Sequence, residues 1–346
     1  MNQCNINLLD LPNEILLIIL KKLDNTDVLY SLFDINNQRL DNILQRNTFT
    51  NSLNFVLTTL TDDILSISDP ILDRFCKNIL PRIHYNVKSL ILNSFSMERI
   101  LLAGDYPNLT ELKIYNFNEK ICLLYFTVET PFRHIFQQQI TELILVFEND
   151  YNEESCEYYT TNVYEFILKF FENLEHLSII GESYPKYFPP LILRSLPLTT
   201  SYSSTLHKLC IHVKNYDDFF ALLDGRLKQL TTLNVVIRDR GEYHSTNVYN
   251  IDDLPDLKCF HLTCHCLTDK YDGQILPLLR RMSNIEALNL DITIDNRSTF
   301  IDGKHIYNEI IVHISRLRTF NFCFCIYSEL NHLVHHLSKD DIQNFF

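Results

Sequence analysis

Cysteine and histidine residues form three short clusters whose side chains could bind a metal ion. Cys264-His265-Cys266 and Cys323-Phe324-Cys325 each place two thiols two residues apart, and His332 and His336 would lie one helical turn apart. Structural zinc sites usually place two to four residues between paired cysteines, and zinc proteases with two such histidines carry a glutamate that is absent here. An extended strand would hold both sulfurs on one face without enclosing an ion. We therefore interpret these cysteines as packing residues and expect no metal and no cofactor.

The rest of the sequence lacks the motifs of common enzymes. It contains no glycine-rich phosphate loop, no nucleophile elbow and no kinase signature, and nothing marks one of the ten cysteines as an activated thiolate. The net charge of −13, without a basic cluster that would reverse it locally, disfavours binding to nucleic acid. We predict a protein that is not an enzyme and that acts by binding other proteins.

The composition is that of a folded chain. Of the 346 residues, 46% are hydrophobic and 21% are charged, and only 6 glycines and 11 prolines are present, which disfavours long linkers. The irregularly spaced cysteines indicate a reducing compartment, and we find neither a signal peptide nor an apolar segment of about 20 residues that could cross a membrane. We expect a monomer that is cytoplasmic, nuclear or both.

Far before these clusters in the sequence, the N-terminal stretch Leu8–Arg46 predicts three short helices. Asp10 can cap the first helix, Asp24 the second and the Asn36-Asn37 pair the third. The first helix contains six consecutive apolar residues, Ile15–Leu20, and is therefore apolar nearly all the way round. About forty residues bury too little surface to cover such a helix on two sides. We infer that a partner protein covers one of them.

The same stretch resembles an F-box, a helical domain that we place at residues 5–47. The resemblance rests on Leu11-Pro12-Asn13-Glu14-Ile15-Leu16, followed by apolar Ile19 and Leu23 and by Asp27-Val28-Leu29 in the second helix. It implies docking onto the Skp-type adaptor, and through it onto the cullin, of a ubiquitin ligase. The residues expected to contact the adaptor are Leu11, Pro12, Ile15, Leu16, Ile19, Leu20, Leu23, Val28 and Leu32.

An apolar pattern recurs from Val87 onward, after a segment at residues 48–86 that we expect to be a helical linker or cap. In the pattern, one apolar residue is followed by another three places later and by a third two places after that. Its nine occurrences start about 29 residues apart on average, which is typical of leucine-rich repeats. They begin at Val87, Leu109, Ile140, Leu174, Leu206, Leu230, Leu257, Ile285 and Leu317.

The last two apolar residues of each occurrence are two apart, which predicts one buried face of a strand. The stretches between occurrences predict helices at 96–105, 159–172, 217–229, 271–282 and 304–315. Strands alternating with helices over short connections indicate parallel strands with helices along one side. We therefore expect an α/β chain in which residues 87–346 form an irregular, curved solenoid that resembles leucine-rich repeats.

The strand residues between the buried ones would line the inner, concave face of such a solenoid, where repeat proteins usually bind their partners. This predicted face is of mixed polarity and nearly neutral, which suits a protein epitope better than a phosphate or a metal. Its members in our prediction are Tyr115, His176, Lys208, His212, Asn234, His261, Asn289 and Asp291.

The resemblance and the repeats together predict a non-catalytic substrate-receptor subunit of a Skp-cullin-F-box ubiquitin ligase. Such a receptor would bind the adaptor through the helical segment and an unidentified protein substrate through the repeats. The alternative is a leucine-rich scaffold or inhibitor outside the ubiquitin system, whose acidic charge would suit a basic protein partner. The two hypotheses differ in whether the apolar first helix is exposed or covered within the chain.

Overall fold

The computed structural model describes residues 8–59, 64–127, 133, 135–147, 160–181, 190–193, 204–223, 227–239, 254–295, 297 and 299–327. Helices alternate with parallel strands along these residues, which confirms the predicted α/β class. The chain divides into two compact units, Met1–Asn149 with Gly181–Lys186 and Asp150–Ile180 with Tyr187–Phe346. The boundary falls inside the predicted repeat region, so each unit contains its own series of strands and helices.

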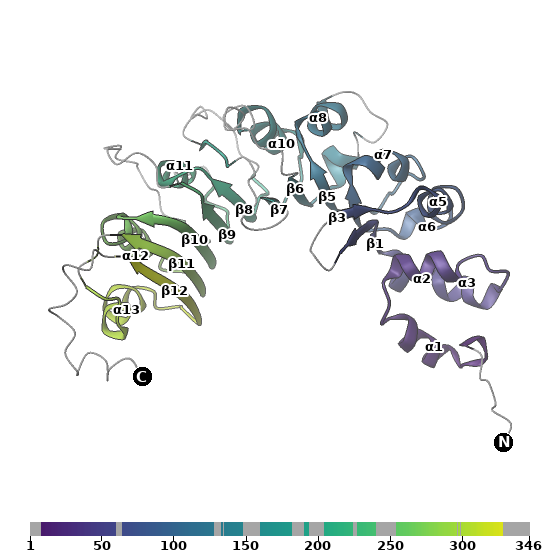
Figure 1. The fold of residues 1–346 in the computed structure, drawn as a ribbon, viewed down its shortest axis with the longest axis horizontal. Helices are drawn as coiled ribbons and strands as arrows, with labels where there is room; N and C mark the ends of the chain where they lie inside the picture. Colours follow the sequence, from purple (N-terminus) through teal and green to yellow (C-terminus); the bar gives the residue numbers. More distant parts are fainter. Residues whose placement is uncertain are drawn as a thin grey trace, which may run out of the picture. The chain divides into compact units, whose positions relative to one another are not determined.

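The first unit begins with short helices and continues into strands (Figure 1). Its helices are η1 (Leu8–Asp10), α1 (Asn13–Leu20), α2 (Asn25–Leu32), α3 (Gln38–Leu44), α4 (Asn47–Thr50), α5 (Asp69–Arg74), η2 (Phe75–Ile79), α6 (Leu80–Ile83), η3 (His84–Asn86), α7 (Ser94–Leu101), α8 (Glu119–Cys122), η4 (Leu123–Thr127) and η5 (Ile135–Gln139). Its strands are β1 (Ser52–Asn54), β2 (Val56–Thr58), β3 (Ile64–Ser66), β4 (Ser89–Asn93), β5 (Glu111–Phe117) and β6 (Glu142–Phe147).

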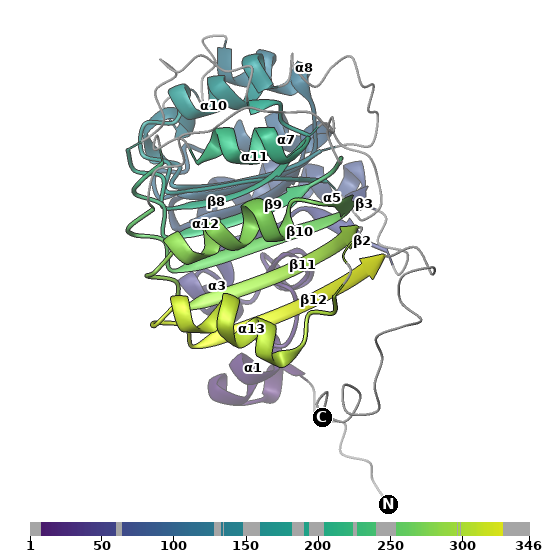
Figure 2. The same cartoon turned by 90° about the vertical axis from the view of Figure 1, so that its left-hand side faces the viewer.

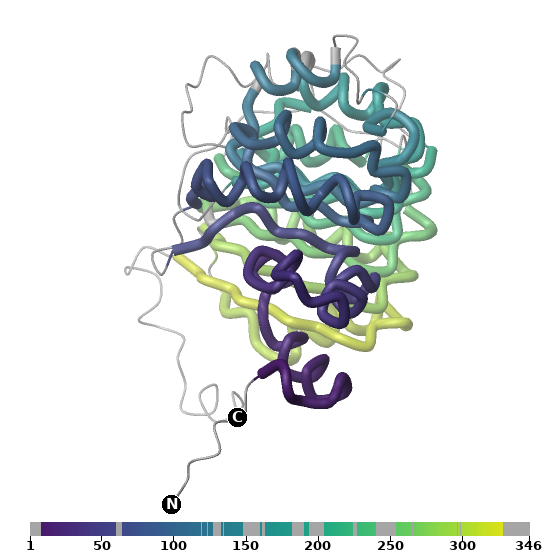
Figure 3. Tube along the Cα trace, turned by 90° about the vertical axis from the view of Figure 1, so that its right-hand side faces the viewer, coloured from purple at the N-terminus to yellow at the C-terminus, as the bar shows by residue number. Residues whose placement is uncertain are grey.

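Parallel strands in the order β1-β4-β5-β6 form the sheet of the first unit. Their buried leucines lie in register, with Leu53 beside Leu90, Leu90 beside Leu112 and Leu112 beside Leu143. Helix α7 packs against β4 and β5 and covers this apolar row. Figure 3 follows the chain from the N-terminal helices, in purple, into the blue layers of strands and helices.

The segment at 48–86 is only partly helical, contrary to our expectation. It contributes β1 to the sheet beside β4, while β2 and β3 form a separate antiparallel pair. Leu53 and Phe55 are both fully buried and two residues apart, which is the strand period. Pairing with β4 also satisfies backbone groups that a buried loop would leave without partners.

The second unit repeats one pattern of strand and helix. Its strands are β7 (His176–Gly181), β8 (Lys208–Val213), β9 (Thr232–Ile237), β10 (Cys259–Thr268), β11 (Ala287–Asp295) and β12 (Thr319–Tyr327). Its helices are η7 (Thr160–Tyr164), α10 (Glu165–Phe170), α11 (Tyr216–Leu222), η9 (Tyr271–Ile275), α12 (Leu276–Arg281), α13 (Gly303–Glu309) and η10 (Ile311–His313).

Strands β7 to β12 follow one another in chain order in a parallel sheet, and α11, α12 and α13 lie along one side of it (Figure 2). The middle apolar residue of each predicted occurrence lies in a single row: Leu177, Leu209, Leu233, Phe260, Leu288 and Phe320. The nine occurrences thus correspond to the nine strands β4 to β12. The five predicted helical stretches overlap α7, α10, α11, α12 and α13, with ends that differ by up to seven residues.

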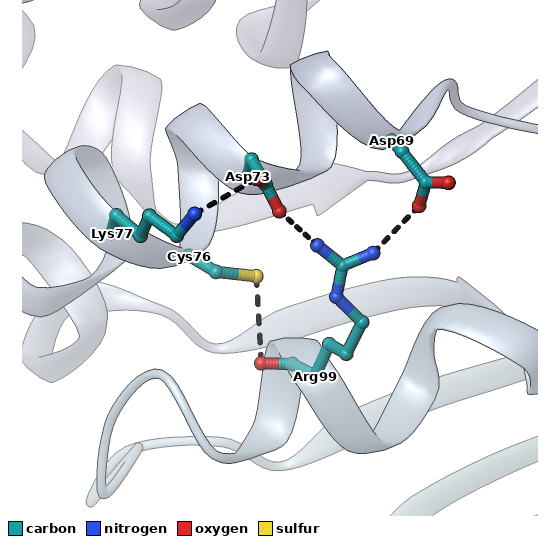
Figure 4. A network of polar contacts seen from close by, with 5 residues as sticks. All are labelled: Asp69, Asp73, Cys76, Lys77 and Arg99. Carbon is teal, nitrogen blue, oxygen red and sulfur yellow. Dashed lines mark hydrogen bonds and ion pairs between the residues drawn. The ribbon is translucent and has the colours of Figure 1, made fainter.

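A polar network joins α5 and η2 to α7 in the first unit (Figure 4). The Arg99 guanidinium donates to Asp69 at 2.7 Å and also to Asp73, to which Lys77 donates at 2.8 Å. The hydrogen bond from Lys77, and to a smaller extent the charge of Arg99, lower the pKa of Asp73. The Cys76 thiol donates to the Arg99 carbonyl at 3.4 Å, and burial raises the pKa of this thiol. The network links two neighbouring helical layers at the surface.

Candidate protein-docking surfaces

The first candidate surface lies on the N-terminal helices of the first unit. Helices α2 and α3 begin at predicted caps: Asp24 accepts from the Thr26 amide at 2.8 Å, and Asn37 accepts from the Leu40 amide at 3.2 Å. The predicted cap at Asp10 is wrong, because Leu8–Asp10 forms the 3-10 turn η1 and α1 begins at Asn13 after Pro12. Helix α1 thus contains the whole apolar run Ile15–Leu20.

Helix α1 has two apolar sides that differ in burial. Leu16 and Leu20, four residues apart, are 0% and 1% exposed and pack inside the chain. Ile15 and Ile19, also four residues apart, are 44% and 39% exposed, and Ile18 is 59% exposed. Residues three or four apart share a face of a helix, so the three isoleucines form one continuous apolar surface. The helix is thus covered on one side and open on the other.

The predicted adaptor contacts divide in the same way. Pro12, Ile15, Ile19 and Leu23 are exposed, Leu11 and Leu32 are half-buried, and Leu16, Leu20 and Val28 are buried. We call the exposed members Pro12, Ile15, Ile19 and Leu23, together with Ile18, the α1 surface below. Ile18 was not in the predicted set. The signal for Ile18 was present in the sequence, since it lies three residues after Ile15.

Arg39 of α3 holds the start of α1 in place. Its guanidinium donates through Nε to Oδ1 of Asn13 at 2.7 Å, and through its two terminal nitrogens to the carbonyls of Leu9, at 3.0 Å, and Leu11. These carbonyls lie just before α1, where the chain turns into the helix. One planar side chain therefore fixes the orientation of the α1 surface relative to α3.

The second candidate surface is the side of the β7–β12 sheet that faces away from α11, α12 and α13 (Figure 2). Asn234, His261 and Asn289 are neighbours in one row across β9, β10 and β11, and the row continues to Asn321 on β12. The Asn321 amide donates to Oδ1 of Asn289 at 2.7 Å. Each of the three predicted residues is half-buried, so the row presents amide and imidazole groups at the surface.

A parallel row contains His212, Thr263 and Asp291, and Thr263 Oγ1 lies 3.2 Å from Nε2 of His261 in the first row. Burial, with a smaller contribution from the charge of Arg238, lowers the pKa of His212 to about 4. Burial also lowers the pKa of His261, against the opposing effect of Asp291. Both imidazoles are therefore neutral at neutral pH. The row of Asn234, His261, Asn289 and Asn321 and the row of His212, Thr263 and Asp291 are together called the strand surface below.

The remaining predicted face residues lie at the edges of this arrangement or outside it. His176 pairs with Lys208 between β7 and β8, and Lys208 is exposed whereas His176 is half-buried. Tyr115 belongs to β5 of the first unit, where the Lys113 ammonium lies 4.6 Å from the centre of its ring. The structure thus brings Asn234, His261 and Asn289 into one row and places Tyr115 in another unit.

The metal hypotheses receive no support from the part of the chain that the structure describes. It contains no group of three histidine, cysteine, aspartate or glutamate side chains that could hold an ion. His332 and His336 lie outside the described residues. Within the described ranges, no helix has the length and apolar character needed to span a bilayer.

No protein-family model matches the sequence, and no curated protein is significantly similar to it.

Proposed function

We propose that the protein is an intracellular substrate-receptor subunit of a Skp-cullin-F-box type ubiquitin ligase. The observation that carries the proposal is the α1 surface, because a helix that packs Leu16 and Leu20 inward leaves Ile15, Ile18 and Ile19 open to solvent. A contiguous exposed apolar patch on a folded chain is typical of a surface that binds another protein. A helical cap that served only its own chain would not need this second apolar side.

The size of the patch suits specific binding. Fully burying an isoleucine or leucine side chain contributes about 1.5–3 kcal/mol, and the α1 surface offers four of them with Pro12 beside them. These side chains are already partly covered, and association costs several kcal/mol in lost freedom of motion. The α1 surface therefore supplies the apolar part of an interface rather than its whole binding energy, and the loss of any one side chain should be measurable.

In this proposal the repeats bind the substrate. The second unit would form part of a curved solenoid with the strand surface on its inner side, and amide and imidazole groups there would recognise polar groups on a protein. The chain itself would perform no chemistry. It would act by proximity, raising the effective concentration of a substrate lysine near the ubiquitin-loaded enzyme that the cullin recruits.

A pull-down with an immobilised Skp-type adaptor tests the proposal. We expect the wild-type chain to be retained, and the double variant Ile15→Ala with Ile19→Ala to be lost, because both side chains are exposed and their truncation leaves the interior of the chain intact. The matched control is Leu102→Ala, which removes an apolar side chain that is 60% exposed elsewhere in the first unit. Leu11→Ala with Pro12→Ala should also abolish retention.

Two results would contradict the proposal. The first is a well-folded wild-type chain that the adaptor does not retain, and the second is retention that survives the Ile15 and Ile19 double substitution. The first result would favour the alternative of an acidic scaffold or inhibitor that binds a basic protein outside the ubiquitin system, and the second would place adaptor binding on a surface other than the α1 surface.

A further inference from the structure

Two cysteine sulfurs are in direct contact near the end of β10. The Sγ atoms of Cys264 and Cys266 are 3.1 Å apart, and Cys264 Sγ also lies 3.3 Å from the carbonyl oxygen of Cys266. Both residues are free thiols. A disulfide has a sulfur–sulfur distance of about 2.0 Å, so a movement of roughly 1 Å would bring these atoms to bonding distance.

The contact arises from an irregularity in β10. Cys264 pairs with Ile292 of β11, but the next paired residue, Thr268, is matched to Ile294, so β10 contains two extra residues between these pairs. In a regular strand, side chains two residues apart are separated by about 7 Å, which is too far for a disulfide. The bulge interrupts the regular spacing of the strand at the place where the two thiols are in contact.

The two thiols differ in their burial and in their pKa. Cys264 is fully buried beside the hydroxyl of Tyr216 from α11, whereas Cys266 is half-buried. The hydrogen bond from the Cys266 thiol, and then that from Tyr216, lower the pKa of Cys264. The hydrogen bond to Cys264, and then burial, raise the pKa of Cys266, so Cys264 is the better nucleophile of the two and Cys266 is the more exposed.

We propose that Cys264 and Cys266 form a redox-sensitive dithiol that hydroperoxides convert into an intrastrand disulfide. One of the two sulfurs attacks the peroxide O–O bond and becomes a sulfenic acid, while the other peroxide oxygen takes up that thiol's proton and leaves as water or an alcohol. The remaining thiol sulfur then attacks the sulfenic sulfur, the S–O bond breaks, and the released hydroxide takes up the remaining thiol proton as water. Two thiols and one hydroperoxide thus give one disulfide, one alcohol or water, and one further water.

A second pair of cysteines in the same unit provides an internal comparison. Cys323 and Cys325 are also two residues apart and are both exposed, but β12 pairs with β11 without a register shift. If exposure alone governed disulfide formation, this pair would react first. If the bulge governs it, Cys264 and Cys266 react first.

The test uses the full-length chain, fully reduced and then treated with hydrogen peroxide. Remaining thiols are trapped with N-ethylmaleimide, and tryptic peptides are identified by mass spectrometry. The peptide Cys259–Lys270 contains both cysteines of the proposed pair together with Cys259. We expect it to lose two hydrogens and to carry a single maleimide, on Cys259, before the peptide with Cys323 and Cys325 is oxidised. A thiol reductant should reverse the change.

Two variants locate the bond. Cys266→Ser should abolish the oxidised peptide, while Cys259→Ser should form it as the wild type does, and circular dichroism establishes that both remain folded. The proposal is overturned if Cys264 and Cys266 both carry maleimide after peroxide has oxidised Cys323 and Cys325. It is equally overturned if the disulfide in the peptide involves Cys259.

Discussion

Arg39 donates through Nε to Oδ1 of Asn13 at 2.7 Å, and this bond joins α3 to the first residue of α1. The same guanidinium reaches two carbonyls of the turn before α1. Helix α1 carries the α1 surface, so one side chain links the stability of the helical segment to the presentation of its binding face. Arginine suits this role because its planar fork offers several donors in fixed directions.

Arg39→Ala should loosen α1 without unfolding the first unit. Hydrogen bonds to a charged group contribute about 1.5–3 kcal/mol, and less where water can replace them, so we expect a loss of about 1–2 kcal/mol in the local stability of α1. Amide hydrogen exchange measures this directly, with faster exchange from residue 16 to residue 20 in the variant. The control is Arg46→Ala, which removes an exposed arginine at the start of α4. Equal exchange in wild type and Arg39→Ala would contradict the assigned role.

Arg99→Met should lower the melting temperature slightly and in a salt-dependent way. The substitution keeps an unbranched apolar side chain but removes both ion pairs to Asp69 and Asp73, which are exposed and therefore weak. High salt screens such pairs, so the difference between wild type and variant should shrink as sodium chloride is raised to about 1 M. Thermal unfolding followed by circular dichroism at low and high salt is the measurement. A difference that does not change with salt would mean that Arg99 acts through packing.

His212 should make the second unit less stable in mild acid. Its folded pKa is lowered to about 4 from 6.5 by burial, so between these values the unfolded chain binds a proton that the folded chain does not. Stability is therefore lost as pH falls from about 6.5 toward 4, and the loss reaches about 3 kcal/mol at the lower value. Urea unfolding at pH 7 and pH 5 should show a smaller pH effect in His212→Gln than in wild type.

A control histidine separates this effect from general acid sensitivity. His313→Gln changes an exposed imidazole of the same unit and is the matched control. Burial lowers the pKa values of His261 and His305 as well, so part of the dependence should persist in His212→Gln. An unchanged pH dependence in His212→Gln would mean that water reaches this imidazole in the folded chain.

The strand surface should be independent of adaptor binding. Asn289→Lys adds a long charged side chain to the centre of the row formed by Asn234, His261 and Asn321. We expect this variant to bind the adaptor with an affinity within about twofold of wild type, because the α1 surface lies in the first unit. Titration calorimetry of wild type and variant measures this. A large loss of adaptor affinity would show that the two proposed surfaces have not been assigned correctly.

The strands were predictable from the sequence because their apolar residues carry a local signal. Leu288 and Leu290 are two apart, recur in the same spacing nine times, and needed no knowledge of their neighbours to be placed on one buried face. The strand at Leu53 was missed because it is short and follows helical segments, and only its pairing with β4 makes it a strand.

The division of α1 into covered and open sides was not predictable. Its residues are apolar on all sides, so the sequence offers no basis for predicting that Leu16 is buried and Ile15 exposed. Their burial depends on which side of the helix packs against the rest of the chain. The same holds for Cys264 and Cys266. Spacing in a regular strand keeps them apart, and the bulge that joins them depends on the unequal lengths of β10 and β11 between paired residues.

Calorimetric titration of a purified Skp-type adaptor into the full-length chain tests the central claim most directly. The proposed receptor predicts one-to-one binding at micromolar affinity or tighter, with a negative heat-capacity change from burial of the α1 surface, and its loss in Ile15→Ala with Ile19→Ala. No heat of binding at several temperatures, from a chain whose circular dichroism and cooperative unfolding show that it is folded, would contradict the assignment to a ubiquitin ligase.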